Sequence, residues 1–233
     1  MSTAGDSSMA WVKGFFKKYP RLYHLLVFVF GVQPMNTTVQ DFVRSLPLNA
    51  RILNIGSGPR VLRTGVINID IAQFEGVDVV ADAEHLPFPD HSADAAILDN
   101  VLEHVRRPDR AVVELLRVLK PGGRIYVATP FVMVYHSSPD DFYRFSAQGL
   151  RELLRDFHEE ELKIQYGPTA AFAFVFCEWL ALTLSFNTLF LYTVVLFAAM
   201  IVTTPLKFLD YLLVHYKRAD NLPNSFYFIG RKK

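Results

Sequence analysis

Small and acidic residues follow three successive apolar runs, in an order that could bind a nucleoside. A Gly56–Gly58 turn follows the first run, Asp70 ends the second, and Asp82 with Ala83 follows the third. Glycines let the backbone approach a ligand closely, and the turn amides can bind its polar groups. A carboxylate at a strand end can accept both hydroxyls of a ribose, so Asp70 is a candidate ribose ligand.

Asp82 could accept the exocyclic amine of adenine while the Ala83 amide reaches a ring nitrogen. Each acid also has a plainer interpretation. Asp70 could be an exposed strand-end carboxylate, and Asp82 could be a turn residue that bonds its own backbone. The types and spacing of these residues therefore indicate a nucleoside pocket without establishing one.

The glycine turn does not fit two common nucleotide motifs. The dinucleotide fingerprint requires a third glycine, which Gly56-Ser57-Gly58-Pro59-Arg60-Val61 lacks. The chain also has no phosphate loop of the Gly-Lys-Ser/Thr type. These features disfavour a nicotinamide-dependent oxidoreductase.

A second group of titratable and aromatic residues follows the run Arg124–Ala128. Its candidate catalytic residues are His136, Asp140, Asp141, Tyr143 and Arg144. His136 is a candidate general base because the charge of histidine changes near neutral pH. Asp140, Asp141 or Tyr143 could orient it or contact an acceptor, and Arg144 could hold a phosphate or carboxylate. Alternatively, Asp141 and Arg144 pair to brace the loop, and His136 is structural.

The composition disfavours several other functions. The formal net charge of +1 gives no electrostatic argument for nucleic-acid binding. Cys177 is the only cysteine, so an intramolecular disulfide or a cysteine metal cluster is impossible. His85 and His91 flank the segment Leu86–Asp90, but the spacing of their neighbours predicts no metal site. The sequence does not determine the oligomeric state.

The apolar runs predict an α/β domain with a largely parallel sheet. They are continuous in valine, isoleucine and leucine rather than alternating, which is typical of strands buried on both faces. The expected strands are Arg51–Ile55, Val66–Ile69, Val77–Val80, Ala95–Leu98, Arg124–Ala128, Leu162–Tyr166 and Ser225–Gly230. The expected helices are Thr37–Leu46 with Asn36 or Thr37 as its cap, one opening within Asp99–Val105, Pro108–Leu119, and Ser146–Phe157 capped by Ser146.

The motifs taken in order resemble the class I S-adenosylmethionine-dependent methyltransferases of the type 11-like group. The resemblance covers roughly Ala50 to Phe157. The segments that carry it are Asn54–Gly58, Asp70, Asp82-Ala83, Leu86-Pro87-Phe88, Asp94, Asp99–Val105 and Leu119–Gly123. It implies a Rossmann-like seven-stranded sheet with an antiparallel last strand, and S-adenosyl-L-methionine as cofactor.

The resemblance also implies roles for individual residues. Gly56 and Gly58 would lie along the methionine part of the cofactor, Asp70 would take the ribose, and Asn100 would lie beside the sulfonium. The full set of expected cofactor-binding residues is Asn54, Gly56, Ser57, Gly58, Asp70, Ile71, Asp82, Ala83, Asp99 and Asn100. The run from His136 to Phe145 is similar to one that faces the methyl group in many bacterial members.

Two features depart from the family pattern. Asn54 occupies a position where the family commonly has an acid, so it brings no negative charge to the sulfonium region. The link between the first two strands is close to the minimum length for a crossover, so we expect at most a turn or two of helix there.

Two apolar segments indicate contact with a membrane. Residues 1–35 mix lysine and arginine with aromatic side chains, which is typical of an interfacial anchor, although a helix packed on the domain is the alternative. From Trp179 to Leu206 there is no charged residue, and extending that run back to Ile164 adds only Glu178. Such a run is long enough to cross a bilayer, and the rest of the chain offers little surface to bury it.

The place of this run between the last two expected strands restricts its path. If both strands belong to one sheet, the run must begin and end on the same side of a membrane, so it forms a hairpin or lies in the interface. Asn187 is a plausible turn point. The lysines and arginines near the C-terminus favour the cytoplasmic face, with cytoplasmic localisation as the alternative.

The sequence therefore predicts a methyltransferase acting at a membrane surface on a lipid, lipid-linked or other hydrophobic acceptor. Its expected parts are residues 1–35, a methyltransferase domain formed by 36–166 plus 222–233, and an apolar helical insertion at 167–221. One alternative is a soluble methyltransferase whose apolar segment forms a lid or a dimer core. Another is a non-catalytic nucleoside-binding scaffold.

Overall fold

The computed structural model describes residues 34–137 and 139–233. The predicted basic and aromatic segment of residues 1–35 therefore lies outside the described residues except for its last two. The described chain divides into two compact units, one formed by Pro34–Phe176 with Phe208–Lys233 and the other by Cys177–Lys207. We refer to the first as the sheet domain and to the second as the hairpin.

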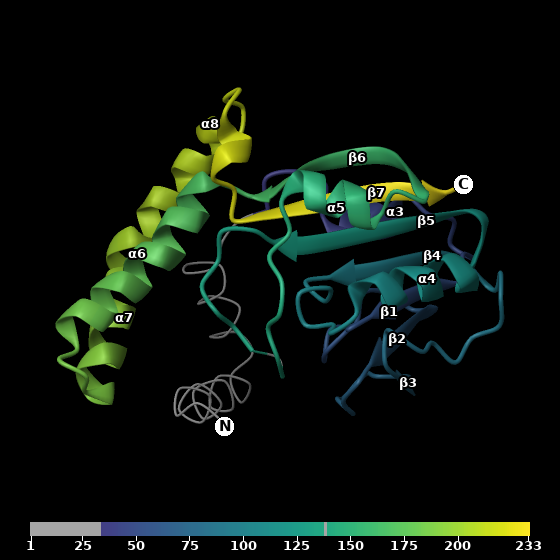
Figure 1. Ribbon diagram of the computed structural model, residues 1–233, viewed down its shortest axis with the longest axis horizontal. Coiled ribbons are helices and arrows are strands. Elements are labelled where there is room, and N and C mark those ends of the chain that lie inside the picture. The colour runs from purple at the N-terminus through teal and green to yellow at the C-terminus, as the bar shows by residue number, and fades with distance from the viewer. Residues whose placement is uncertain (1–33, 138) are drawn as a thin grey trace. The chain divides into compact units, whose positions relative to one another are not determined.

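The sheet domain contains a seven-stranded sheet with strand order β3-β2-β1-β4-β5-β7-β6 (Figure 1). Strands β1 to β5 pair in parallel, whereas β7 runs antiparallel to both β5 and β6. The strands are β1 (Ile52–Ile55), β2 (Val66–Asp70), β3 (Val79–Val80), β4 (Ala93–Asp99), β5 (Leu119–Pro130), β6 (Phe157–Tyr166) and β7 (Ser225–Lys232). This order confirms the predicted Rossmann-like sheet with an antiparallel last strand.

Several predicted element boundaries were wrong. No helix forms in residues 56–65 between β1 and β2, because the link is too short to hold one. The segment Asp99–Val105 forms turns rather than the opening of a helix. Asn100 has a positive φ of 58°, which interrupts helical geometry there. The helix begins at Pro108, as the predicted helix Pro108–Leu119 did, and the missing N–H of this proline is harmless in the first turn.

Three helices pack on the sheet, α3 (Val39–Arg44), α4 (Pro108–Val118) and α5 (Ala147–Leu153). Thr38, one residue beyond the predicted cap, caps α3 in a reciprocal capping box with Asp41. Ser146 caps α5 as predicted, with its hydroxyl oxygen accepting from the Gly149 amide at 3.1 Å. Side-chain capping thus fixes where two of these helices begin.

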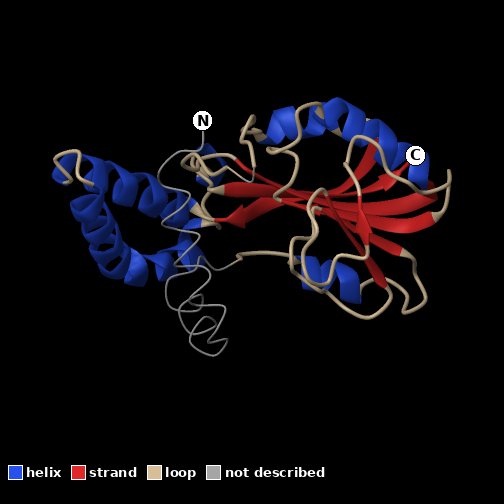
Figure 2. Cartoon of the chain, turned by 90° about the horizontal axis from the view of Figure 1, so that it is seen from below, coloured by secondary structure: helices blue, strands red, loops and turns tan. Residues whose placement is uncertain are grey.

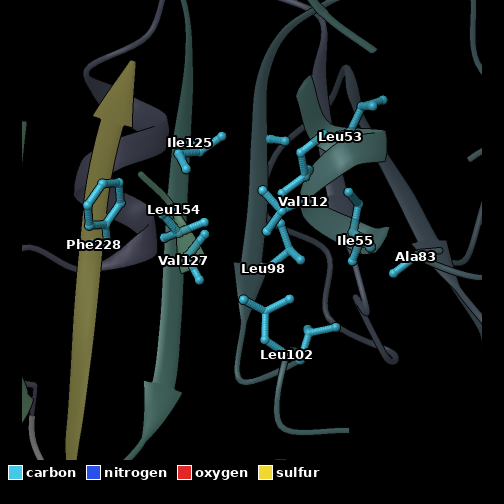
Figure 3. Close-up of a cluster of buried hydrophobic side chains, with 14 of the residues drawn as sticks. Leu53, Ile55, Ala83, Leu98, Leu102, Val112, Ile125, Val127, Leu154 and Phe228 are labelled. Carbon is cyan, nitrogen blue, oxygen red and sulfur yellow. The ribbon is translucent and has the colours of Figure 1, made fainter. Parts of the chain in front are cut away.

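The helices cover both faces of the sheet (Figure 2). Leu53 of β1 and Leu98 of β4 pack on one face with Leu115 of α4 and Leu150 of α5. Figure 3 shows part of this cluster, with Leu53 and Leu98 projecting from neighbouring strands. The opposite face packs against α3, including Phe42. Burial on both faces explains why the strand sequences are continuously apolar.

The hairpin connects β6 to β7 through α6 (Pro168–Leu184) and α7 (Leu189–Thr203). Phe186 and Asn187 have positive φ between the two helices, so the predicted turn at Asn187 is confirmed. The Tyr192 hydroxyl lies 2.8 Å from both carboxylate oxygens of Glu178, which gives the acid of the apolar run a polar partner. The two helices are therefore tied side by side.

Helical structure continues past α7 through η1 (Thr204–Leu209) and α8 (Asp210–Leu213), and η2 (Ala219–Asn221) precedes β7. Among the described residues, Leu189–Leu213 is the one helix long and apolar enough to cross a membrane, judged by length and composition only. Its described side chains are largely exposed.

Asp210 joins the two ends of the segment that carries the hairpin. Its buried carboxylate accepts the amides of Thr169 at 2.7 Å and Ala170 at 3.1 Å, in the first turn of α6. A Cβ at position 167 would lie 2.4 Å from Asp210 Cγ, so the glycine there leaves room for the acid. The acid satisfies two amides that the helix itself leaves without partners.

Candidate functional site

The predicted cofactor residues lie at one edge of the sheet, where β3, β2, β1 and β4 end. Strand order reverses between β1 and β4, and such switch points form the crevice that binds ligands in open α/β sheets. Gly56 and Gly58 follow β1 with φ of 66° and 52°. A Cβ on Gly56 would lie 2.4 Å from Val101 Cγ2, so the turn requires glycine there for two reasons.

Asp70 links the second strand to the glycine turn. One oxygen of its carboxylate accepts the Gly58 amide at 2.8 Å, and the other accepts the Ala72 amide at 3.0 Å. Its side chain is buried, while the adjacent Ile71 is 62% exposed. The carboxylate thus fixes the turn beside the switch point, and each oxygen keeps acceptor capacity for a further donor.

Asp82 follows β3 and accepts the Glu84 amide at 2.9 Å, which is the turn contact raised as an alternative. The residue is exposed, whereas Ala83 is buried. A direct link ties this loop to β2, since the Ala81 amide donates to the Asp70 carbonyl at 2.9 Å. Asp82 and Asp70 therefore lie at the ends of neighbouring strands.

The segment after Asp82 is held by α4. Glu114 accepts the Leu86 amide at 2.7 Å, and the Arg117 guanidinium donates to the Leu86 carbonyl at 2.8 Å and the Phe88 carbonyl at 2.7 Å. The Arg117 side chain lowers the pKa of Glu114, and burial only partly offsets this effect. The loop is therefore positioned by charged hydrogen bonds rather than by its own turn alone.

The Asn54 side chain is directed towards the neighbouring strand β2. Its buried side-chain amide donates to Asn68 Oδ1 on β2 at 2.9 Å. This bond satisfies a polar group inside the sheet. The asparagine therefore has a clear structural contact at the position where the family commonly has an acid.

Asp99 ends β4 on the other side of the switch point. It forms an ion pair with Arg60, which follows the glycine turn, at 2.6 Å. Its second oxygen accepts from Asn100 at 3.1 Å and from Gln165 of β6 at 3.2 Å. The next residue, Asn100, holds its positive φ with a bond from its amide to the Ala128 carbonyl at 3.0 Å.

The predicted catalytic loop is docked on the segment that follows Asn100. The Phe142 amide donates to the Glu103 carbonyl at 2.7 Å, and His104 Nδ1 lies 2.5 Å from the Asp140 carbonyl oxygen. The Tyr143 hydroxyl donates to the Arg106 carbonyl at 3.0 Å. The two segments, far apart in sequence, are therefore held together by backbone contacts.

Asp141 and Arg144 form the bracing pair that was one of the two predicted alternatives. The guanidinium contacts both carboxylate oxygens and also donates to the Val134 carbonyl at 3.0 Å. Burial alone would raise the pKa of Asp141, but bonds from Arg144 and the His136 amide outweigh it and lower the pKa. The pair holds the loop and leaves the His136 ring to other contacts.

Glu103 is the residue of this region that the sequence did not single out. Its side chain is fully buried, and neither carboxylate oxygen has a hydrogen-bond partner among the described residues. His104 Nε2 lies 3.7 Å and His136 Nε2 3.8 Å from its Oε1. Glu103 raises the pKa of His136, burial opposes that rise, and Asp141 adds to it.

Only folding reveals this group of three residues. Glu103 and His104 are adjacent in sequence, but His136 comes from the loop after β5, and no ligand-like spacing connects them. The signal available in the sequence was the adjacent pair of an acid and a histidine a few residues after the predicted strand Ala95–Leu98.

Comparison with known proteins supports the resemblance. Residues 60–127 match the model of a methyltransferase domain family. The chain is 40% identical over 92 residues to a demethylmenaquinone methyltransferase of Thermobifida fusca, covering 39% of this chain and 38% of that protein. It is also 38% identical over 101 residues to the ubiquinone/menaquinone biosynthesis C-methyltransferase UbiE of Chromobacterium violaceum, covering 43% of this chain and 38% of that protein.

The match of residues 60–127 to a methyltransferase domain agrees with the predicted resemblance to the class I S-adenosylmethionine-dependent methyltransferases. Solved structures with the same fold include a methyltransferase from Thermotoga maritima described as a possible histamine N-methyltransferase. It has a TM-score of 0.52 and 20% identity, with 94% of this chain and 98% of that chain covered. The [4+2]-cyclase SpnF has a TM-score of 0.53 and 21% identity, with 93% and 94% covered.

Only some properties of the similar proteins can be carried over to this chain. The chain spans well under two thirds of the curated relatives that it matches, so their full activities do not transfer directly. The fold also occurs in the cyclase SpnF, so the fold alone does not decide the reaction. The reaction and the acceptor must therefore be argued from the site.

Proposed function

We propose that the chain binds S-adenosyl-L-methionine at the switch point and transfers its methyl group to a hydrophobic acceptor at a membrane surface. The observation that carries the first part is the bond from the Gly58 amide to Asp70. It puts an acid and a glycine-rich turn at the same sheet edge. A carboxylate acceptor beside such a turn suits an adenosyl ligand, and the methyltransferase domain match agrees with it.

Particular residues would hold each part of the cofactor. Gly56, Ser57 and Gly58 would line its amino-acid portion, Asp70 and Ile71 would bind the ribose, and Asp82 with Ala83 would bind the adenine. The rest of the cofactor site would be lined by Asn54, Asp99 and Asn100. When bound, the cofactor supplies a methyl group already activated by the sulfonium charge, so the protein's task is mainly to align the acceptor.

The loop after β5 is the proposed acceptor side. Asp141 and Arg144 brace it, and the His136 side chain of this loop is partly exposed. If the acceptor loses a proton, neutral His136 is the side chain of the loop suited to remove it. Asp140 and Tyr143, which bond to the neighbouring segment, would keep that ring in position.

Calorimetric titration with S-adenosylmethionine tests cofactor binding. We expect Asp70→Ala and Asp82→Ala to weaken binding by about tenfold or more, because each removes a charged acceptor. Asp82→Ala is the cleaner variant, since Asp70 also positions the turn. Asp109→Asn is a matched control, because Asp109 is an exposed acid paired with Arg107 on α4. Unchanged binding in both Asp70→Ala and Asp82→Ala would contradict the assignment of these two acids to the cofactor.

The apolar hairpin supports an acceptor that resides in a membrane. Phe190 and Val202 are each 75% exposed, and Trp179 is 57% exposed. A helix that is apolar on all sides is typical of burial in a protein core or a bilayer. The curated relatives named above are quinone methyltransferases by name, which agrees with a quinone-like or other lipid-soluble acceptor. The basic residues near the C-terminus favour the cytoplasmic face.

Vesicle co-sedimentation tests the membrane part separately. We expect the full chain to bind vesicles, and Phe190→Lys with Val202→Lys to release it, because lysine in the apolar layer is costly. Val113→Lys is the matched control, since Val113 is 63% exposed on α4 of the sheet domain. The alternative of a lid or dimer core would be favoured if the wild-type protein is monodisperse without detergent and does not bind vesicles.

A further inference from the structure

We propose that Glu103, His104 and His136 form a binding site for a divalent transition-metal ion. The three residues offer one carboxylate oxygen and two imidazole nitrogens that all lie within 4.8 Å of one another. They come from the segment after β4 and the loop after β5, at the same carboxyl edge of the sheet as the glycine turn. The site is separate from the residues proposed to hold the cofactor.

The buried acid is the first argument. Glu103 is fully buried, and both of its carboxylate oxygens lack a hydrogen-bond partner among the described residues. A buried charge without a partner is strongly unfavourable, and such groups in proteins are paired or bind metals. The two histidines lie 3.7 and 3.8 Å from this carboxylate, close enough for an ion pair when they are protonated but beyond hydrogen-bond distance. A bound cation would satisfy this carboxylate.

The orientation of the histidines is the second argument. His104 turns Nδ1 to the Asp140 carbonyl at 2.5 Å, and His136 Nδ1 lies 3.4 Å from the Val134 carbonyl and 3.6 Å from Asp141. Both rings therefore direct Nε2 towards Glu103. Metal-binding histidines commonly donate the other ring N–H to a carbonyl or a carboxylate, which leaves the ligating nitrogen unprotonated.

The separations suit a small ion. With metal–ligand distances of roughly 2.0–2.2 Å, ligand atoms around a tetrahedral ion lie about 3.3–3.6 Å apart. The observed 3.7 and 3.8 Å would reach this range with small side-chain rotations. Two imidazoles and a carboxylate favour zinc, iron, cobalt or manganese over magnesium, which prefers oxygen ligands and water.

Access to the site is also suitable. The His136 side chain is 31% exposed and that of His104 13%, so solvent reaches the cluster from the histidine side while Glu103 closes the other. Three protein ligands leave coordination positions open for water or an oxygen of an acceptor. With an ion bound, His136 is a ligand, so its proposed role as a base applies to the chain without a metal.

Metal binding can be measured on the full-length chain without any activity assay. The protein is stripped with a chelator and titrated with Zn²⁺ by calorimetry and with Co²⁺ by visible absorption. We expect one ion per chain in the wild type. Glu103→Gln and His136→Ala should each weaken Zn²⁺ binding by about 10- to 100-fold or more. His85→Ala and His158→Ala are controls, because these exposed histidines lie outside the cluster.

Two results of these titrations would overturn the proposal. One is a wild type that takes up no Zn²⁺ or Co²⁺, and the other is equal uptake by the wild type, Glu103→Gln and His136→Ala, which would mean an adventitious ion only. Loss of cofactor binding in the Asp70 and Asp82 variants would not affect either result, so this proposal can fail independently of methyl transfer.

Thermal unfolding provides a second readout and controls for misfolding. In chelator we expect Glu103→Gln to be at least as stable as the wild type, because it removes a buried charge without a hydrogen-bond partner. With Zn²⁺ the wild type should gain stability and the variant should not. A variant that is much less stable than the wild type in chelator would show that Glu103 serves as an ion-pair partner of the histidines, and the metal site would be rejected.

Discussion

Helix α4 of the sheet domain and helix α7 of the hairpin differ in how their apolar side chains are distributed and buried. In α4, apolar side chains such as Val112 and Leu115 are buried on one side, and charged residues occupy the other. In α7, apolar side chains surround the helix, and Phe190 and Val202 are exposed. The sheet domain therefore buries its apolar side chains in its own core, whereas many apolar side chains of the hairpin helices are exposed.

The largest expected effect tests this difference directly. Leu115→Ala should lower the free energy of unfolding of the sheet domain by about 2–5 kcal/mol, because it opens a cavity in a close-packed core. Leu182→Ala in the hairpin should change it by about 0.5 kcal/mol or less, since Leu182 is 62% exposed. Chemical denaturation in detergent measures both. Equal losses would mean that Leu182 is also part of a packed core.

The glycine turn offers a matched pair within the sheet domain. Gly56→Ala should cost about 2–4 kcal/mol, because it combines a left-handed backbone with a clash against Val101. Gly58→Ala should lower the free energy of unfolding by about 1–2 kcal/mol. The added Cβ would meet no atom within 4 Å, so only the left-handed backbone conformation is unfavourable. Thermal unfolding ranks the two, and the reverse order would contradict the geometry of the turn.

The start of α6 depends on a contact inside the sheet domain. Asp210→Ala should destabilise the first turn of α6 by about 1–3 kcal/mol, because the Thr169 and Ala170 amides would lose their buried acceptor. Hydrogen exchange should show faster exchange at those two amides, with the Leu150 amide of α5 as an internal reference. Unchanged exchange at Thr169 and Ala170 would refute this role of Asp210.

The smallest expected effect is on the stability of the sheet domain at low pH. Arg117 depresses the pKa of Glu114, so the contribution of Glu114 is present above its ordinary pKa of roughly 4.3 and is lost as pH falls through the lowered value. Glu114→Gln should therefore reduce, by about 0.5–1.5 kcal/mol, the stability lost between neutral pH and pH 3. Glu152→Gln, at an exposed ion pair, is the control. Denaturant midpoints across pH test the sign, and an identical pH dependence would argue against it.

The sheet could be predicted because strands that are buried on both faces have continuously apolar sequences. Continuous apolar runs marked the strands, and Ser146 marked the start of α5 by its ability to cap an amide. The expected helix within Asp99–Val105 was wrong, because the left-handed conformation of Asn100 depends on a bond to the Ala128 carbonyl in a neighbouring strand. Such a long-range constraint has no local signature.

The candidate site divides in the same way. Gly56, Asp70 and Asp82 could be chosen from sequence because each follows a strand whose end must lie at the same sheet edge. The contact between Asp70 and the Gly58 amide could not be inferred, since it depends on the path of the loop. Glu103 was missed because a buried acid without a hydrogen-bond partner is recognisable only from what surrounds it.

Residue type and local spacing were enough to predict the order of strands and helices along the chain, the glycine turn, and the apolar character of the hairpin. Only the folded chain shows that Arg144 holds Asp141, and that His136 and Glu103 meet across two distant segments. The physical reason is that hydrogen bonds and charge pairs act over a few ångströms in space, whatever their separation along the chain.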